Sequence, residues 1–186
     1  MGNFVSIIPA RGRSNTIPNK NIRVMAGKPL IGYAIENMKC CENIDLIVVT
    51  TDDPDISLVA KQYGCYVIER PDELCGDHIT LDEVILHAVN YLEDDGFSFE
   101  NYLIIKPIAP LLRLETIQRA IEILGERSEV DSIVSVLPEE RRLWYEEGEQ
   151  WKNISINAGR VYREIGVIFA VRRRVITPES WLGSSV

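Results

Sequence analysis

The chain has 186 residues, of which 46% are hydrophobic and 26% charged, and its net charge is −8 at pH 7. These values suit one soluble globular domain with a single core and argue against a general nucleic-acid-binding surface. No apolar run approaches the roughly 20 residues that a membrane-spanning helix needs, and the N-terminal residues do not read as a signal peptide. The cysteines show no metal-binding spacing, so we expect reduced thiols in a cytoplasmic protein.

Strands and helices are expected to alternate along the first 138 residues. Apolar segments typical of strands lie at 3–9, 44–51, 65–69, 101–107 and 130–138. Segments with helical spacing lie between them, at 29–41, 51–64, 79–96 and 113–126. Asp53 and Thr80 are the expected N-caps of the second and third helices. This alternation predicts an α/β fold with a mostly parallel sheet.

The pattern changes after Pro138. Residues 139–153 are charged and aromatic without clear periodicity, an apolar strand is expected at 166–171, and the last 15 residues show no clear element. We interpret the segment at about 139–165 as a β-ribbon excursion or an oligomerisation arm. Its aromatic residues fit a protein interface better than a base-stacking surface, because their surroundings are acidic.

The first strand leads into a basic loop. Residues 1–39 contain six basic residues against Glu36 alone, a local charge of +5, so the remainder carries −13. A basic island in an acidic protein concentrates its field on a small anion, although a solvated loop could have the same composition. In a parallel sheet, ligands bind beyond the carboxyl ends of the strands. The loop lacks the familiar phosphate-binding fingerprints, but Arg11 and Lys20 can face phosphates and Gly12 allows close backbone approach.

The residues "IIPARGRSNTIPNKNI" resemble the signature of the acylneuraminate (CMP-sialic acid synthetase-like) cytidylyltransferases. The resemblance continues in order through "AGKPLIGYAIE", "IVVTTDD", "VIERPDELCGD", "LDEVILHAV" and "LIIKPIAPLLR", and more weakly through "VYREIGVIFAV". It implies a single domain over residues 1–186, with the Rossmann-like three-layer αβα sandwich of the nucleotide-diphospho-sugar transferases.

The resemblance also implies an activity. Such enzymes transfer a cytidylyl group from CTP to an acidic keto-sugar of the sialic, legionaminic or pseudaminic type, with Mg²⁺, and release pyrophosphate. Relatives are commonly dimers that exchange an arm, so a homodimer is expected, with no nucleic-acid or membrane partner. The residues that match the nucleotide-binding positions are Arg11, Gly12, Ser14, Lys20, Asn21, Arg70 and Asp77, of which Arg11 and Lys20 are also expected to be catalytic. Sugar binding is assigned to Thr80, Asp82 and Lys106.

Three departures from the family pattern leave two interpretations open. The lysine that follows the loop serine is Asn15 here, and "KPIAPLLR" stands for Q-P-T-S-P-L-R, so Lys106 replaces a glutamine. The C-terminal aspartate motif that supplies metal ligands is not visible, and the metal ligands stay unassigned. The chain is either a divergent cytidylyltransferase or a catalytically degenerate nucleotide-binding relative that acts as a binding or regulatory protein. An octulosonate acceptor is a third interpretation, but the loop fits the sialic type better.

Three other side chains near the predicted site have ordinary explanations. Asp52 and Asp53 form a carboxylate pair that could bind a metal, but helix capping and a favourable helix dipole are preferred. His87 falls on a long amphipathic helix, where a structural role is expected.

Overall fold

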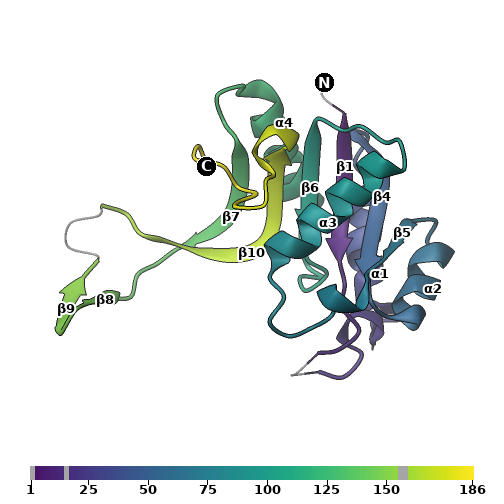
Figure 1. Cartoon of the computed structure of the whole chain (residues 1–186), viewed down its shortest axis with the longest axis horizontal. Coiled ribbons are helices and arrows are strands. Elements are labelled where there is room, and N and C mark those ends of the chain that lie inside the picture. The colour runs from purple at the N-terminus through teal and green to yellow at the C-terminus, as the bar shows by residue number, and fades with distance from the viewer. Residues whose placement is uncertain (1–2, 15–16, 155–158) are drawn as a thin grey trace.

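The computed structural model describes residues 3–14, 17–154 and 159–186. Its centre is a six-stranded sheet in the order β5-β4-β1-β6-β10-β7 (Figure 1). The strands are β1 (Phe4–Pro9), β4 (Ile44–Thr51), β5 (Tyr66–Glu69), β6 (Asn101–Ile105), β7 (Ser132–Pro138) and β10 (Tyr162–Arg172). The first four strands of that order are parallel, whereas β10 runs antiparallel to both of its neighbours. The predicted mostly parallel sheet is therefore confirmed, with one reversed strand inside it.

Helices cover both faces of this sheet. The α-helices among the described residues are α1 (Leu30–Lys39), α2 (Pro54–Gln62), α3 (Leu81–Asp94) and α4 (Leu114–Glu126). Phe4 and Ile8 of β1 belong to the core that the sheet shares with α1, α2 and α4, while Val5 and Ile7 belong to the core shared with α3. Successive strand residues point to opposite faces, so an uninterrupted apolar strand fills both cores. This is the three-layer αβα arrangement expected from the sequence.

The predicted helix starts are confirmed by side-chain hydrogen bonds. Asp53 Oδ1 accepts the N–H groups of Asp55 and Ile56, both at 2.9 Å. Thr80 and Glu83 form a capping box at the start of α3. The remaining short elements are η1 (Lys20–Ile22), β2 (Val24–Met25), β3 (Lys28–Pro29), η2 (Asp72–Leu74) and η3 (Arg173–Val175).

A long arm leaves the sheet between β7 and β10 (Figure 1). Its tip is an antiparallel hairpin of β8 (Trp144–Glu147) and β9 (Gln150–Asn153). The side chains of Trp144, Tyr145 and Trp151 are exposed on it. The arm carries a β-hairpin in the described residues, while its oligomeric role stays a prediction. In the described part of the chain, no helix is both long and apolar enough to cross a membrane.

The C-terminal segment, for which no clear element was expected, packs tightly against the sheet. Trp181 is only 5% exposed and its ring centroid lies 4.8 Å from that of Phe169 on β10. The carbonyl of Ser185 accepts the N–H of Asp131 at 2.8 Å. One buried tryptophan and a few backbone contacts hold the segment in place. Because it forms no long helix or strand, its sequence shows no periodic pattern.

Candidate functional site

A pocket of about 390 Å³ lies where loops that follow the parallel strands meet. Six residues assigned to the site from the sequence line it, namely Arg11, Lys20, Asn21, Arg70, Thr80 and Lys106. They come from the loop after β1, from η1, from the residues after β5 and β6, and from the start of α3. The remaining lining is mainly apolar and includes Pro9, Val84 and Ile108. The pocket is therefore lined by four basic side chains together with apolar ones, which suits an anionic ligand that also has an apolar face.

The loop after β1 is held by contacts to its backbone. Asn21 is buried, and its Nδ2 donates to the carbonyl of Arg11 at 2.9 Å. The Arg11 guanidinium forms an ion pair with Asp77 at 2.9 Å, and the two side chains are 44% and 68% exposed. An exposed pair of this kind contributes little to stability, so an anion in the pocket can replace Asp77 as the partner of Arg11.

Arg70 is a half-buried cation that two hydrogen bonds hold in place. Its Nε donates to Thr50 Oγ1 at 3.1 Å, and its Nη2 donates to the Thr50 carbonyl at 2.8 Å. Burial lowers the pKa of Arg70, and the carboxylate of Asp52 acts in the opposite direction. An arginine side chain stays protonated under such a shift, so the site keeps a full positive charge there.

Two other predicted residues in the first loop have structural partners. The N–H of Gly12 donates to Asp52 Oδ1 at 2.8 Å. Ser14 Oγ accepts the N–H of Ile17 at 3.3 Å. Neither residue lines the pocket. Asn15, which carries the departure from the family signature, lies outside the described residues.

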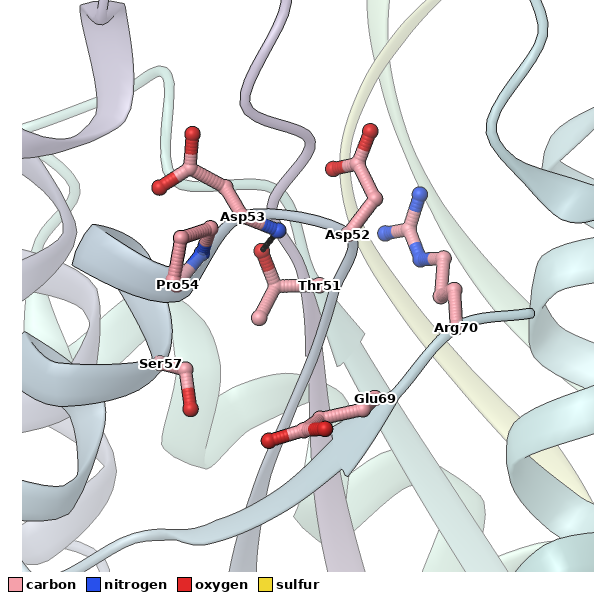
Figure 2. Close-up of a pocket in the computed structure, with 7 residues that line it drawn as sticks. All are labelled: Thr51, Asp52, Asp53, Pro54, Ser57, Glu69 and Arg70. Carbon is pink, nitrogen blue, oxygen red and sulfur yellow. Dashed lines mark hydrogen bonds between the residues drawn. The ribbon is translucent and has the colours of Figure 1, made fainter. Parts of the chain in front are cut away.

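A smaller pocket of about 180 Å³ lies beside Arg70, between the start of α2 and the end of β5 (Figure 2). It contains the carboxylates of Asp52, Asp53 and Glu69. The first of these accepts the Gly12 N–H and the second caps α2, so both have structural partners, as the favoured capping interpretation expected for Asp53. An acidic hollow does not suit an anionic ligand, and we place the candidate site in the larger pocket.

A second hollow of about 260 Å³ adjoins the larger pocket and shares Leu81 and Lys106 with it. Asp82 lies there, together with Glu164, Phe169 and Trp181, which sequence reasoning did not assign to the site. Lys106 Nζ lies 5.5 Å from the centre of the Phe169 ring. The two hollows together would hold a ligand larger than a nucleotide.

Glu164 enters this hollow because β10 is irregular. The pairing of β10 with β7 shifts register between Glu164 and Phe169, and Gly166 within that stretch has φ +59°. A Cβ at Gly166 would lie 3.1 Å from Lys106 Nζ and 3.2 Å from Glu164 Oε1, so both charged groups lie close to this glycine. A bulge redirects side chains in this way, and a glycine inside an apolar strand was the signal that could have revealed it.

The described residues do not assemble a protein cage for a metal. No group of three or more His, Cys, Asp or Glu side chains within them could hold an ion. Mg²⁺ in nucleotide sites is commonly bound by one or two carboxylates together with substrate phosphates and water. The described residues fit that pattern if phosphate oxygens and water supply most of the ligands of the ion.

Comparison with known proteins decides the family. A family model described as cytidylyltransferase matches residues 5–175. The chain belongs to the cytidylyltransferase family. This confirms the resemblance that the sequence motifs indicated.

Two curated relatives illustrate the range of this cytidylyltransferase family. The chain is 36% identical over 139 residues to a CMP-N,N'-diacetyllegionaminic acid synthase of Legionella pneumophila, covering 73% of this chain and 58% of the relative. It is 31% identical over 133 residues to an N-acylneuraminate cytidylyltransferase of Escherichia coli, covering 72% of this chain and 31% of the relative. The chain thus spans less than two thirds of the length of either protein.

A solved structure supports the fold. A CMP:2-keto-3-deoxy-manno-octonic acid synthetase in complex with CTP superposes with a TM-score of 0.73 at 18% identity. The match covers 98% of this chain and 79% of that structure.

His87 on α3 gives this cytidylyltransferase-family chain a testable pH dependence. Burial lowers the pKa of His87, and the positive charge of Arg70 adds to the effect. As the pH falls below the ordinary pKa of 6.5, the unfolded chain therefore takes up a proton more readily than the folded chain does. The free energy of unfolding thus decreases as the pH decreases. We expect His87→Gln to reduce this loss between about pH 7 and pH 5, as measured by urea unfolding. His78→Gln removes an exposed histidine and is the control; equal pH slopes for wild type and His87→Gln would contradict the prediction.

Proposed function

We propose that the chain transfers a cytidylyl group from CTP to an acidic keto-sugar of the sialic, legionaminic or pseudaminic type. The observation that carries the proposal is the convergence of Arg11, Lys20 and Arg70 on one pocket in a cytidylyltransferase fold. The described cysteines are free thiols, which supports the cytoplasm as the proposed location. The products are a CMP-sugar and pyrophosphate.

The reaction needs little covalent chemistry from the protein. A hydroxyl oxygen of the sugar attacks the α-phosphorus of CTP, the bond from that phosphorus to the bridging oxygen breaks, and pyrophosphate leaves while the hydroxyl loses its proton. Positioning and stabilisation of charge then account for most of the catalysis. Arg11 and Lys20 are the proposed catalytic residues, because both line the pocket and can bind the triphosphate. Mg²⁺ bound to the phosphate oxygens would neutralise charge on the leaving group.

The nucleotide base is assigned to the buried side of the pocket. Asn21 is 5% exposed and Arg70 is held by Thr50, so both present donors whose positions are set before a ligand arrives. Such preorganised donors suit a planar base that must be distinguished from other bases. Gly12 and Ser14 support the triphosphate loop through their own contacts, and Asp77 is proposed to face the ribose or the sugar once Arg11 binds phosphate.

The adjoining hollow is the proposed acceptor site. Lys106 stands between the two hollows and is the proposed partner of the acceptor carboxylate. Thr80 and Asp82 at the start of α3, with Glu164 opposite, can accept hydrogen bonds from sugar hydroxyls. An acidic polyhydroxylated acceptor matches one cation surrounded by hydrogen-bond acceptors.

The first prediction of the proposed function concerns nucleotide selectivity. Thermal unfolding with CTP, UTP, GTP and ATP, each with and without Mg²⁺, should show stabilisation that is selective for CTP. A ligand at about 100 times its dissociation constant stabilises a fold by roughly 2.7 kcal/mol. Equal shifts with all four nucleotides, or none, would contradict a cytidine-specific site.

Turnover separates the enzyme from a degenerate binding protein. Release of pyrophosphate should follow when CTP and Mg²⁺ are supplied with sialic, legionaminic or pseudaminic acid. A panel that includes 3-deoxy-octulosonate tests the alternative acceptor. Selective CTP binding without pyrophosphate release from any of these acids would favour the degenerate binding protein.

The second prediction separates acceptor from donor binding. Lys106→Ala should raise the KM for the sugar acid about tenfold to a hundredfold, because a hydrogen bond to a charged group contributes ~1.5–3 kcal/mol. Its effect on CTP binding should be small. Lys20→Ala should instead weaken CTP binding, and Lys61→Ala on the exposed side of α2 is the matched control. The assignment fails if Lys106→Ala and Lys20→Ala change the same parameter, or if Lys61→Ala behaves like either.

A homodimer is the proposed assembly, with the arm as its interface. Trp144, Trp151 and Tyr162 on the arm are 53%, 65% and 49% exposed, an unusual concentration of exposed aromatic surface. Aromatic side chains of this kind dominate the energetics of protein interfaces.

The third prediction concerns this interface. Combined Trp144→Ser and Trp151→Ser should convert a dimer into a monomer in sedimentation equilibrium, because the substitutions remove the largest apolar side chains of the hairpin. Leu58→Ser, at a 57% exposed apolar position on α2, is the control. A wild-type monomer, or a dimer that survives the double substitution, would exclude the hairpin as the interface.

A further inference from the structure

We infer that Asp52 is a positioning residue, which holds the triphosphate loop at Gly12 in place opposite the Arg70 guanidinium. The inference rests on the proposed function, since it assumes that the two elements bind one nucleotide. Asp52 does not line that pocket, so it acts through its neighbours and is not a catalytic residue.

The first contact joins the loop to the end of β4. β1 and β4 pair in parallel, and the pairing continues beyond β1 with a hydrogen bond from the Ala10 N–H to the Thr50 carbonyl at 3.0 Å. Two residues later the Gly12 N–H donates to Asp52 Oδ1 at 2.8 Å. The carboxylate thus extends the pairing into the loop, where the backbone of β4 has already turned toward α2. Arg11 lies between these two anchored residues, so its backbone position is restrained on both sides.

The second contact is the close packing of the Asp53 side chain against Gly12. Asp53 is anchored because its Oδ1 caps α2. A Cβ at Gly12 would lie 2.3 Å from Asp53 Oδ2 and 2.6 Å from Asp53 Cβ, so only glycine fits against this side chain. The hydrogen bond to Asp52 and the close approach to Asp53 together restrain the backbone of the loop at Gly12. A residue without a Cβ is therefore required at position 12, because the side chain of Asp53 lies against it.

The third interaction is electrostatic. Arg11 and Arg70 line the same pocket, and the charge of Arg11 disfavours the charged form of Arg70. The Asp52 carboxylate favours the charged form, although burial, the largest cause, still leaves the pKa of Arg70 lowered. Figure 2 shows the side chains of Asp52 and Arg70 extending to the same side of the strand ends. One carboxylate thus lets two cations stay together before a phosphate arrives.

Helix capping does not explain Asp52, because Asp53 performs it. A matched control for a purely structural role exists on the same strand. Asp45 lies near the start of β4, and its Oδ2 accepts the N–H of Phe4 on β1 at 3.2 Å. Asp45→Ala therefore removes the same kind of contact between the same two strands, at the end of the sheet away from the pocket.

The experiment compares Asp52→Ala, Asp52→Asn and Asp45→Ala with the wild type in two measurements on the full chain. Exchange of the Gly12 amide proton is followed by NMR without ligand. Binding of CTP and of inorganic tripolyphosphate is followed by calorimetry. In Asp52→Ala we expect faster exchange at Gly12 and about five- to tenfold weaker binding of both ligands, the size of effect that a lost hydrogen bond produces. Asp52→Asn keeps the acceptor oxygen and should restore slow exchange, but only part of the affinity, because it lacks the charge beside Arg70.

The outcomes separate the inference from the proposed function. Unchanged Gly12 exchange in Asp52→Ala, or the same loss of affinity in Asp45→Ala, would overturn the inference. Faster exchange with full CTP affinity would overturn it as well, since the loop would then need no positioning. A wild type that binds neither ligand but shows the expected exchange pattern would overturn the proposed function and reduce Asp52 to an anchor of the loop.

Discussion

The parallel pairing of β1 with β4 and β6 is the constraint on which the rest of the structure depends. Both faces of β1 are buried, and its residues Ile7 and Ile8 are each 0% exposed. Because β1, β4, β5 and β6 run in the same direction, the carboxyl ends of all four strands lie at the same end of the sheet. Three of the loops that follow, those after β1, β5 and β6, bring Arg11, Arg70 and Lys106 to one pocket. Apolar burial in the sheet thus determines where the charges lie.

That convergence creates an electrostatic problem that the neighbouring carboxylates reduce. Arg11 pairs with Asp77 at the exposed side of the pocket, and Asp52 offsets the charge of Arg70 at the buried side. The two partners differ in kind. The exposed pair can be exchanged for a phosphate at little cost, whereas the contacts of Arg70 with Thr50 hold it in place. The site therefore combines a replaceable contact at its entrance with a rigid one at its base.

The reversed strand β10 brings residues from the C-terminal part of the chain to the hollow that adjoins the pocket. It lies between β6 and β7, and the arm leads into its N-terminal end. Its pairing with β7 is interrupted around Gly166. That stretch brings Glu164 beside Lys106, which comes from the other half of the chain. The C-terminal segment completes the hollow with Trp181. Acceptor recognition would thus depend on contacts between residues that are far apart in the sequence.

The sequence by itself determined the elements and their order. Buried strands read as apolar runs, Asp53 and Thr80 marked helix starts, and the motif order indicated the family, because each of these signals depends on residues that are near one another in the chain. The resemblance also named Arg11, Lys20, Asn21 and Arg70 as candidate binding residues, and in the structure all four line one pocket.

Only the tertiary structure decided which side chains are partners. The hydrogen bond from Gly12 to Asp52 and the ion pair of Arg11 with Asp77 join residues 40 or more positions apart, and Lys106 and Glu164 lie close to the same glycine. The packing of Trp181 on Phe169 depends likewise on how the last residues cross the sheet. Such contacts have no local pattern, because strand order and the path of each loop set the distances, and these follow from the burial of the whole core.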